Sequence, residues 1–337
     1  MFPQSTKNNS GIVIIPLLTR GLLLLVSTLA TIATSAPAAT CSHRGELDAL
    51  FCDEDRNLTA DAPVDPSRLR NPPALLMSYS PQEDTGSYEK LWAPFVTHLG
   101  QCTGKPVRFF QVHSSAAVVE AFRSGRIHFS LLATGDTPFA VNVAGAVPYG
   151  GIGGNKGLLG YHVVTLVRKD SAFRKLADLK GKRVAHTAPS SNSGNMAPRA
   201  LFPAEGLVPD KDYKVIYSGK HDNSILGVLR GDYDAAAVAD DVLDRLVTRG
   251  TVKAADFRVI FTSKPFPAGS MVFAHDLAPA VVKSIRDCTL NYRFSRQLVE
   301  AFQGSDRFVP LDYKRDFDSV REVAQASGEM KKKETAR

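Results

Sequence analysis

Residues 186–198, HTAPSSNSGNMAP, carry a dense cluster of small polar side chains. Positions 190–193 read Ser-Ser-Asn-Ser, and Gly194 follows them directly. Each of these side chains is a neutral hydrogen-bond donor, and a glycine lets a ligand approach the backbone closely. This combination of residues has the chemistry needed to bind an oxyanion. The competing interpretation is a solvated loop in which one serine caps a helix.

A predicted strand precedes this cluster and a predicted helix follows it, at 182–186 and 196–204. In open α/β sheets, ligands bind beyond the carboxyl ends of the strands, where loops lead into helices. A helix N-terminus presents unpaired N–H groups and about half a positive charge there, which suits an anion. Pro198 removes a backbone donor about one turn into the helix, so we expect an irregular first turn. No Lys-Ser/Thr pair follows the cluster, which argues against a nucleotide-binding P-loop.

Further polar turns also follow predicted strands. The segment SGKHDNS brings His221 to a strand end, where it can donate to an oxyanion or serve a purely structural role. The next strand ends at Asp240 and Asp241, one of which can cap the following helix. Upstream, Ser114 and Ser115 stand at another strand-to-helix junction. We expect these turns to converge on one edge of a cleft.

The same residues admit an enzymatic interpretation. Ser191 or Ser193, His221 and Asp241 occur in the order Ser, His, Asp that some hydrolases use. The chain lacks the G-x-S-x-G sequence that exposes such a nucleophile, and nothing marks an oxyanion hole separate from the serines. We therefore expect no enzyme. A periplasmic hydrolase would instead show ester hydrolysis that is lost in Ser193→Ala.

The length of 337 residues exceeds one ordinary core and suits two domains of about 120 residues each. A content of 44% hydrophobic and 22% charged residues is typical of globular proteins. Of the formal net charge of +7, two charges lie at Lys7 and Arg20 and a net three in the final KKKETAR. About two charges remain for the body, which is not the basic surface of a nucleic-acid-binding protein. The basic tail, 327–337, is expected to be disordered.

Residues 1–39 predict a secretory signal peptide. An apolar run of 13 residues, 21–33, is followed by small residues with Ala36 and Ala38 in an A-x-A cleavage pattern. The run is too short for a bilayer, which needs about 20 apolar residues. An uncleaved anchor and lipid attachment at Cys41 are the alternatives. The favoured interpretation predicts a periplasmic protein.

All four cysteines lie after the predicted cleavage site. An even number of cysteines in an oxidising compartment indicates two disulfides. Cys41 and Cys52 bracket a short loop, so we expect them to pair and to leave Cys102 with Cys288. Four cysteines permit three connectivities, and the sequence alone does not exclude the other two. No spacing typical of a metal site is present, so we expect no metal and no cofactor.

Strand-like and helix-like segments alternate from residue 73 onward, which predicts an α/β fold with mainly parallel sheets. A glycine-rich link at 145–160 separates a first block, 73–160, from a second block, 161–263. The segment 264–326 is too short for a third domain, so we expect it to return to the first block. The chain would then cross between two lobes twice and form a cleft. Residues 40–72 are expected to be a disulfide-pinned leader.

Several segments together resemble a known family. They are SYSPQED, FRSGRIHFSLL, GYHVVTLVRKDS, LADLKGKRVAHTAPSSNSGNMAP, SGKHDNSILGVLRGDYDAAAVADDVLDRL and FPAGSMVF. In consistent order over about residues 74–305, they resemble the phosphate/phosphonate periplasmic binding proteins of ABC importers. The resemblance implies a two-lobed type II binding-protein fold, in which each lobe has a mainly parallel sheet flanked by helices. The ligand would occupy the cleft between the lobes.

The resemblance also implies the ligand-binding residues. They are Ser191, Asn192, Ser193, His221, Tyr161 and Asp241, with Ser115 and Ser114 as further candidates. Ser115 stands where aminoalkylphosphonate binders have a tyrosine, and PFPAGSMVF lacks their acidic residue. These departures suit a smaller ligand, such as phosphite, phosphate or methylphosphonate. Asp241 beside an anion would favour a ligand that brings an acidic O–H or an amine.

We therefore expect a monomeric periplasmic solute-binding protein that closes around a small phosphorus oxyanion and delivers it to an ABC permease. One alternative is a binding protein for another oxyanion or a small organic acid. Another is a ligand-sensing partner of a membrane receptor.

Overall fold

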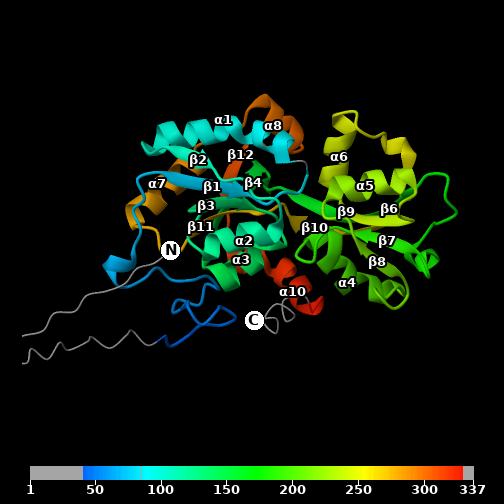
Figure 1. The fold of residues 1–337 in the computed structure, drawn as a ribbon, viewed down its shortest axis with the longest axis horizontal. Helices are drawn as coiled ribbons and strands as arrows, with labels where there is room; N and C mark the ends of the chain where they lie inside the picture. The colour runs from blue at the N-terminus through cyan, green and yellow to red at the C-terminus, as the bar shows by residue number, and fades with distance from the viewer. Residues whose placement is uncertain (1–40, 84, 329–337) are drawn as a thin grey trace, which may run out of the picture. The chain divides into compact units, whose positions relative to one another are not determined.

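Two β-sheets organise the part of the chain that the computed structural model describes, residues 41–83 and 85–328 (Figure 1). The first sheet contains β1 (Leu75–Tyr79), β2 (Val107–Phe109), β3 (Phe129–Leu132), β4 (Ala146–Gly154), β5 (Gly157–Leu158), β11 (Ser270–Ala274) and β12 (Arg307–Pro310). The second contains β6 (Gly160–Arg168), β7 (Arg183–His186), β8 (Lys214–Tyr217), β9 (Ala235–Ala239) and β10 (Phe257–Pro267). We call the two sheets with their helices lobe 1 and lobe 2.

Helices flank both sheets. Lobe 1 carries α1 (Thr85–Thr103), α2 (Ser115–Arg123), α3 (Asp136–Ala144), α7 (Pro279–Leu290), α8 (Arg296–Ala301) and α9 (Tyr313–Asp316). Lobe 2 carries η3 (Asn192–Met196), α4 (Ala197–Leu201), α5 (His221–Arg230) and α6 (Asp240–Thr248). The short 3-10 helices are η1 (Pro66–Arg68), η2 (Leu176–Leu179), η4 (Phe202–Glu205) and η5 (Ala254–Asp256). The last helix, α10 (Asp318–Ala326), packs against α3 and also against η3 and α4.

Both sheets are mixed, which corrects the expectation of mainly parallel sheets. The strand orders are β12-β4-β11-β3-β1-β2, with β5 beside β4, and β10-β6-β9-β7-β8. In lobe 1 only β2, β1 and β3 pair in parallel, and in lobe 2 only β8, β7 and β9. The physical reason lies in β6 and β11, which enter their lobes from the other lobe. Each runs opposite to both of its neighbours and so makes two antiparallel pairs.

The segment 145–160 is not a link. It forms β4 and the β4–β5 hairpin, and β4 lies inside the lobe 1 sheet between β11 and β12. Its glycines allow close packing, because a Cβ at Gly153 would collide with the backbone of Gly157 and with the side chain of Val309. Helix α3 and strand β12 were not anticipated either.

The chain crosses between the lobes twice, from β5 to β6 and from β10 to β11. Thr134, just after β3, stabilises the second crossing. Its hydroxyl donates to Pro267 O at 2.7 Å and accepts from Gly269 N at 3.1 Å. The two-lobed architecture with two crossings is therefore confirmed. The boundaries 73–160 plus 264–326 and 161–263 stay a prediction.

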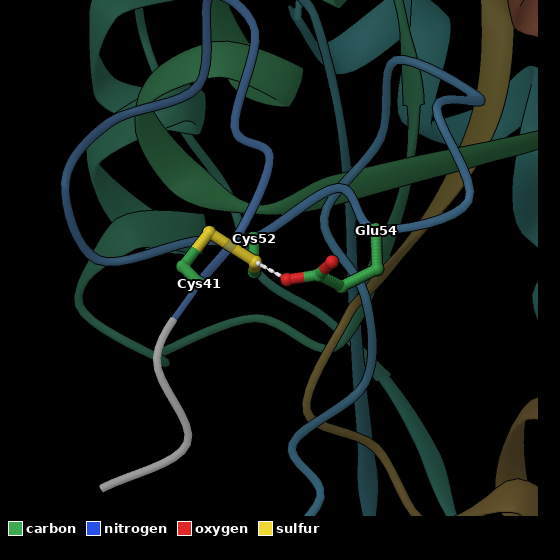
Figure 2. A group of neighbouring side chains, drawn as sticks. All are labelled: Cys41, Cys52 and Glu54. Carbon is green, nitrogen blue, oxygen red and sulfur yellow. Dashed lines mark hydrogen bonds between the residues drawn. A yellow bond between two sulfur atoms is a disulfide. The ribbon is translucent and has the colours of Figure 1, made fainter.

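Both predicted disulfides are present. Cys102 joins α1 to Cys288 in α7, so the last part of the chain does contact lobe 1. In the leader, Cys41 is bonded to Cys52, and Glu54 Oε1 lies 2.9 Å from Cys52 Sγ (Figure 2). These three side chains have metal-like spacing, but the disulfide consumes both thiols. The leader also packs on lobe 1, where Asp48 N donates to a backbone carbonyl of α3.

An aromatic cluster holds α1 and α8 over the lobe 1 sheet. Trp92 stacks on Phe308 of β12 at a centroid distance of 5.9 Å and contacts Phe302 at 5.5 Å. These three side chains are nearly inaccessible to solvent, and burial of each contributes roughly 1.5–3 kcal/mol. The cluster fixes Phe302, which reaches the boundary between the lobes.

The predicted signal peptide, 1–39, and most of the predicted basic tail, 327–337, lie outside the described residues. Among the helices that the structure describes, none combines the length and the apolar character needed to cross a membrane.

Candidate ligand-binding site

A small cavity lies between the lobes, beyond the carboxyl ends of β1, β3, β7 and β9. The volume open to the centre of a water molecule is about 60 Å³. At roughly 10–15 Å³ per water, this space holds about five water molecules. Its polar wall includes Ser80, Gln82, Ser115, Thr134, Tyr161, Thr187, Ser191, Asn192, Ser193, Lys220, His221 and Asp241. Its apolar wall includes Leu131, Ile152, Ala239, Ala268 and Phe302.

The Ser-Ser-Asn-Ser cluster enters the cavity on a π-helical turn, η3. Ser191 caps this turn, because its hydroxyl accepts from Gly194 N at 3.0 Å. Asn192 and Ser193 are buried at 2% and 4% exposure and line the cavity. Pro198 begins the regular helix after the wide turn, so the predicted irregular first turn is confirmed. π-Turns of this kind are frequent at functional sites.

A buried network behind the turn fixes its shape. The ring of His186, at the end of β7, contacts Asn195 Oδ1 through Nδ1 and Tyr213 OH through Nε2, both at 2.8 Å. The Asn195 amide also donates to Pro189 O at 2.9 Å. Burial lowers the pKa of His186 to about 4, so the ring is neutral at neutral pH. The π-turn is thus held by hydrogen bonds inside lobe 2, including one from Arg199 Nε to Asn195 Oδ1 at 3.0 Å.

His221 stands at the first position of α5 and faces the cavity. Its Nε2 lies 3.5 Å from Ser193 Oγ, while its Nδ1 is buried and has no hydrogen-bond partner among the described residues. Its backbone N–H points to Gln82 O of lobe 1 at 3.4 Å. Burial lowers the pKa of His221 to about 4, which makes the ring a neutral donor near pH 7. The structure places His221 in the cavity wall, and its contact with an oxyanion stays a prediction.

Tyr161 reaches the cavity from the first crossing. Asn192 Nδ2 and the Tyr161 hydroxyl are 2.7 Å apart, and Asn192 Oδ1 has no partner among the described residues. An amide turned by 180° would accept from the tyrosine and leave its NH₂ group free to donate into the cavity. Burial raises the pKa of the Tyr161 hydroxyl, so it stays neutral.

Asp241 lines the cavity, but its carboxylate belongs to an ion pair. Its Oδ2 accepts from Arg245 Nη1 at 2.8 Å, one turn along α6. The neighbouring Asp240 points elsewhere and binds His162 through its backbone N and ring Nδ1. No Ser-His-Asp chain is assembled in the described site, because the Nδ1 of His221 makes no hydrogen bond to Asp241.

The structure separates the two serines of lobe 1. Ser115 lines the cavity, whereas Ser114 is exposed and caps α2 by accepting from Ala117 N at 3.2 Å. Ser114 is therefore not brought to the cavity. Ser190 was not a candidate, yet its hydroxyl donates to Asp136 Oδ1 of lobe 1 at 2.7 Å.

Sequence reasoning missed three hydroxyl groups of the cavity wall, those of Ser80, Thr134 and Thr187. Ser80 follows β1 and Thr187 follows β7, and both side chains are 2% exposed. The oxygen of each is buried without a hydrogen-bond partner among the described residues. Both follow strands, the same pattern that pointed to the other turns.

Two sheets joined by two crossings, with a ligand-sized cavity between the lobes, define the class of two-lobed solute-binding proteins. Within this class, the chain belongs to the family of periplasmic substrate-binding proteins of ABC phosphonate transporters, whose sequence pattern matches residues 77–317. The predicted family is confirmed. Proteins of this family bind a small molecule outside the cytoplasm for a membrane permease, so the chain is a binding protein and not an enzyme.

Two characterised relatives are similar over much of the chain. It is 28% identical over 243 residues to the phosphate-import protein PhnD of Mycolicibacterium smegmatis, covering 67% of this chain and 74% of that protein. It is 26% identical over 205 residues to the phosphonates-binding periplasmic protein of Escherichia coli K12, covering 60% of this chain and 61% of that protein.

Solved structures share the fold. PhnD1 from Prochlorococcus marinus in complex with methylphosphonate has a TM-score of 0.69 at 19% identity, covering 77% of this chain and 100% of that one. The binding protein of an ABC phosphonate transporter from Pseudomonas aeruginosa has a TM-score of 0.65 at 19% identity, covering 79% and 99%.

Proposed function

We propose that this protein captures a small tetrahedral phosphorus oxyanion, such as phosphate, phosphite or methylphosphonate, in the interlobe cavity. The observation that carries this proposal is a set of buried polar atoms, on residues that line the cavity, that have no hydrogen-bond partner within the described part of the chain. They are Ser80 Oγ, Thr187 Oγ1, Asn192 Oδ1 and His221 Nδ1. Buried polar groups are nearly always hydrogen-bonded, so these atoms favour a polar ligand. The names of the relatives support phosphorus oxyanions as the class.

The size of the cavity supports the smallest members of this class. About 60 Å³, room for about five water molecules, suits a small ion such as phosphate or methylphosphonate. Larger organophosphonates would need the lobes to separate further. The apolar wall near Ile152 and Phe302 suits a P–H or P–CH₃ group better than a fourth charged oxygen.

Preorganised donors would supply the affinity. Charge-assisted hydrogen bonds contribute roughly 1.5–3 kcal/mol each, so five give a gross ~7–15 kcal/mol. Association costs on the order of 4–15 kcal/mol. Tight capture therefore requires donors that are already in place, and the buried network behind η3 provides this rigidity.

The compartment, the oligomeric state and the transport partner are proposed from the sequence. Residues 1–39 support export to the periplasm, where a monomer would carry its ligand to an ABC permease. Transport and ligand sensing share this binding step.

Isothermal titration calorimetry on the refolded, ligand-stripped mature protein tests the proposal. The panel is phosphite, phosphate, methylphosphonate, 2-aminoethylphosphonate and sulfate. We expect one-to-one binding of a phosphorus oxyanion, weakened at least about tenfold by Ser193→Ala and by His221→Ala. Ser114→Ala is the matched control, since this serine lies outside the cavity. Silence across the panel would remove the phosphorus assignment and turn attention to organic acids.

A further inference from the structure

An ion-pair cluster spans the two lobes beside the cavity; it consists of Glu83, Asp241, Arg245 and Arg249. Arg245 Nε donates to Glu83 Oε1 at 2.6 Å, and its Nη1 donates to Asp241 Oδ2 at 2.8 Å. Arg249 binds the other oxygen of Glu83. Glu83 follows β1 of lobe 1, whereas Asp241 and Arg245 lie on α6 of lobe 2 and Arg249 is the C-cap of that helix. The cluster can be complete only when the lobes meet.

The ion pairs of Arg245 are strong because they are buried. The side chains of Arg245, Glu83 and Asp241 are 5%, 3% and 9% exposed, whereas that of Arg249 is 42% exposed. Two carboxylates face two guanidinium groups, so the cluster is neutral as a whole. Removing one partner of a buried pair leaves an uncompensated charge, which is strongly unfavourable.

Only one member of the cluster lines the ligand cavity, and that is Asp241. An isolated carboxylate in this wall would repel a bound anion and attract a ligand ammonium group. Arg245 compensates the carboxylate from behind, and its guanidinium carbon lies 5.5 Å from the centre of the Phe302 ring. Phe302 itself forms part of the cavity wall. The arginine therefore sets the charge that a ligand meets at this wall.

We propose that Arg245 is a specificity-determining residue, which holds Asp241 in an interlobe ion pair so that the cavity rejects ligands carrying an ammonium group. This inference rests on the proposed function, since it concerns which phosphonates the same cavity binds. It differs from the expectation that Asp241 favours a ligand with an acidic O–H or an amine, which stays a prediction. The selection acts at closure, because Glu83 joins the cluster from the opposite lobe.

The test compares two probes of equal size, ethylphosphonate and aminomethylphosphonate, by calorimetry on the full mature protein, with phosphate and methylphosphonate as references. The variants are Arg245→Met, the control Arg249→Met, and the double variant Asp241→Asn/Arg245→Met. Both single variants remove one contact with Glu83, but only Arg245 contacts Asp241. Circular dichroism establishes that each variant is folded.

We expect the wild type to prefer ethylphosphonate by at least about tenfold. Arg245→Met should shift the ratio of the two dissociation constants by about 30-fold or more toward aminomethylphosphonate. Arg249→Met should leave that ratio within about threefold of wild type, and the double variant should lose the gain for the amine.

Three results would overturn the inference: a wild type that binds aminomethylphosphonate as tightly as ethylphosphonate, a ratio in Arg245→Met that shifts no more than in Arg249→Met, or a double variant that keeps the gain. If the wild type binds phosphate but neither probe, the deciding result is whether Arg245→Met, and not Arg249→Met, binds aminomethylphosphonate. If Arg245→Met does not fold, the wild-type ratio and the double variant decide. A wild type that binds neither the probes nor the references would refute the proposed function together with the inference.

Discussion

Gly135 offers a way to block closure of the lobes without touching a ligand donor. It precedes α3 in lobe 1, with φ −72° and ψ −26°, a conformation that alanine adopts without strain. A Cβ at this position would lie 2.5 Å from Asn192 N and closer still to Ser190 O, both in lobe 2. Cβ atoms essentially never come within 3.0 Å of such atoms. Gly135→Ala should therefore leave each lobe intact and force the lobes apart.

The size of the effect follows from the contacts at this boundary. Separation of the lobes would also lengthen the hydrogen bond between Ser190 Oγ and Asp136 Oδ1, which is 2.7 Å long. It would move apart the donors that the two lobes offer to a ligand. Loss of two charge-assisted hydrogen bonds costs roughly 3–6 kcal/mol. We therefore expect the affinity for methylphosphonate to fall at least about 100-fold.

Calorimetry with methylphosphonate measures this loss, and a melting curve establishes that the variant is folded. Gly100→Ala in α1 is the control, because a Cβ there would meet its nearest atoms, Lys105 O and Val107 N, at the ordinary contact distances of 3.8 and 3.9 Å. It should bind as the wild type does. If Gly135→Ala bound methylphosphonate with wild-type affinity, the closed arrangement of the lobes would not be the binding state and the reasoning would fail.

Three other predictions concern affinity and stability. Tyr161→Phe removes the hydroxyl that holds the neighbouring asparagine amide and should weaken methylphosphonate binding by about fivefold or more in calorimetry; unchanged affinity would remove this residue from the site. Cys102→Ser with Cys288→Ser removes a disulfide between residues that are 186 positions apart. The unfolded chain then gains conformational entropy, so the free energy of unfolding should fall by up to about 5 kcal/mol in urea titrations, and an unchanged value would contradict this argument. His186 and His221 have folded pKa values of about 4 against 6.5 when unfolded, so stability present above pH 6.5 should be lost as the pH falls toward 4, on the order of 3 kcal/mol each; a constant melting temperature over this range would show that the rings are not buried and neutral.

The sequence predicted the parts of the fold that local chemistry controls. Alternating strand and helix patterns placed nearly every element of lobe 2, and the Ser-Ser-Asn-Ser cluster marked the turn that enters the cavity. Pro198 indicated the irregular helix start, because a residue without an N–H cannot make the regular i→i−4 hydrogen bond of a helix that begins near Asn192. Spacing and compartment favoured the disulfide pairing that is observed, although the sequence left two other connectivities open.

Features that depend on distant partners were not predictable in this way. Strand β4 is rich in glycine, and glycine has no side chain to show alternation, so the segment resembled a link. The ion-pair cluster beside Asp241 includes Glu83, which lies far away in the sequence and contacts Arg245 only through the fold. Ser114 and Ser115 are adjacent and chemically alike, and only the direction of α2 decides which one faces the cavity.

The most direct test of the central claim is a crystal structure of the mature protein with methylphosphonate. We predict the anion in the interlobe cavity, with phosphonate oxygens within about 3.2 Å of Ser193 Oγ, a ring nitrogen of His221 and the Asn192 amide. An anion bound outside this cavity, or inside it with none of these three groups within hydrogen-bond distance, would contradict the account.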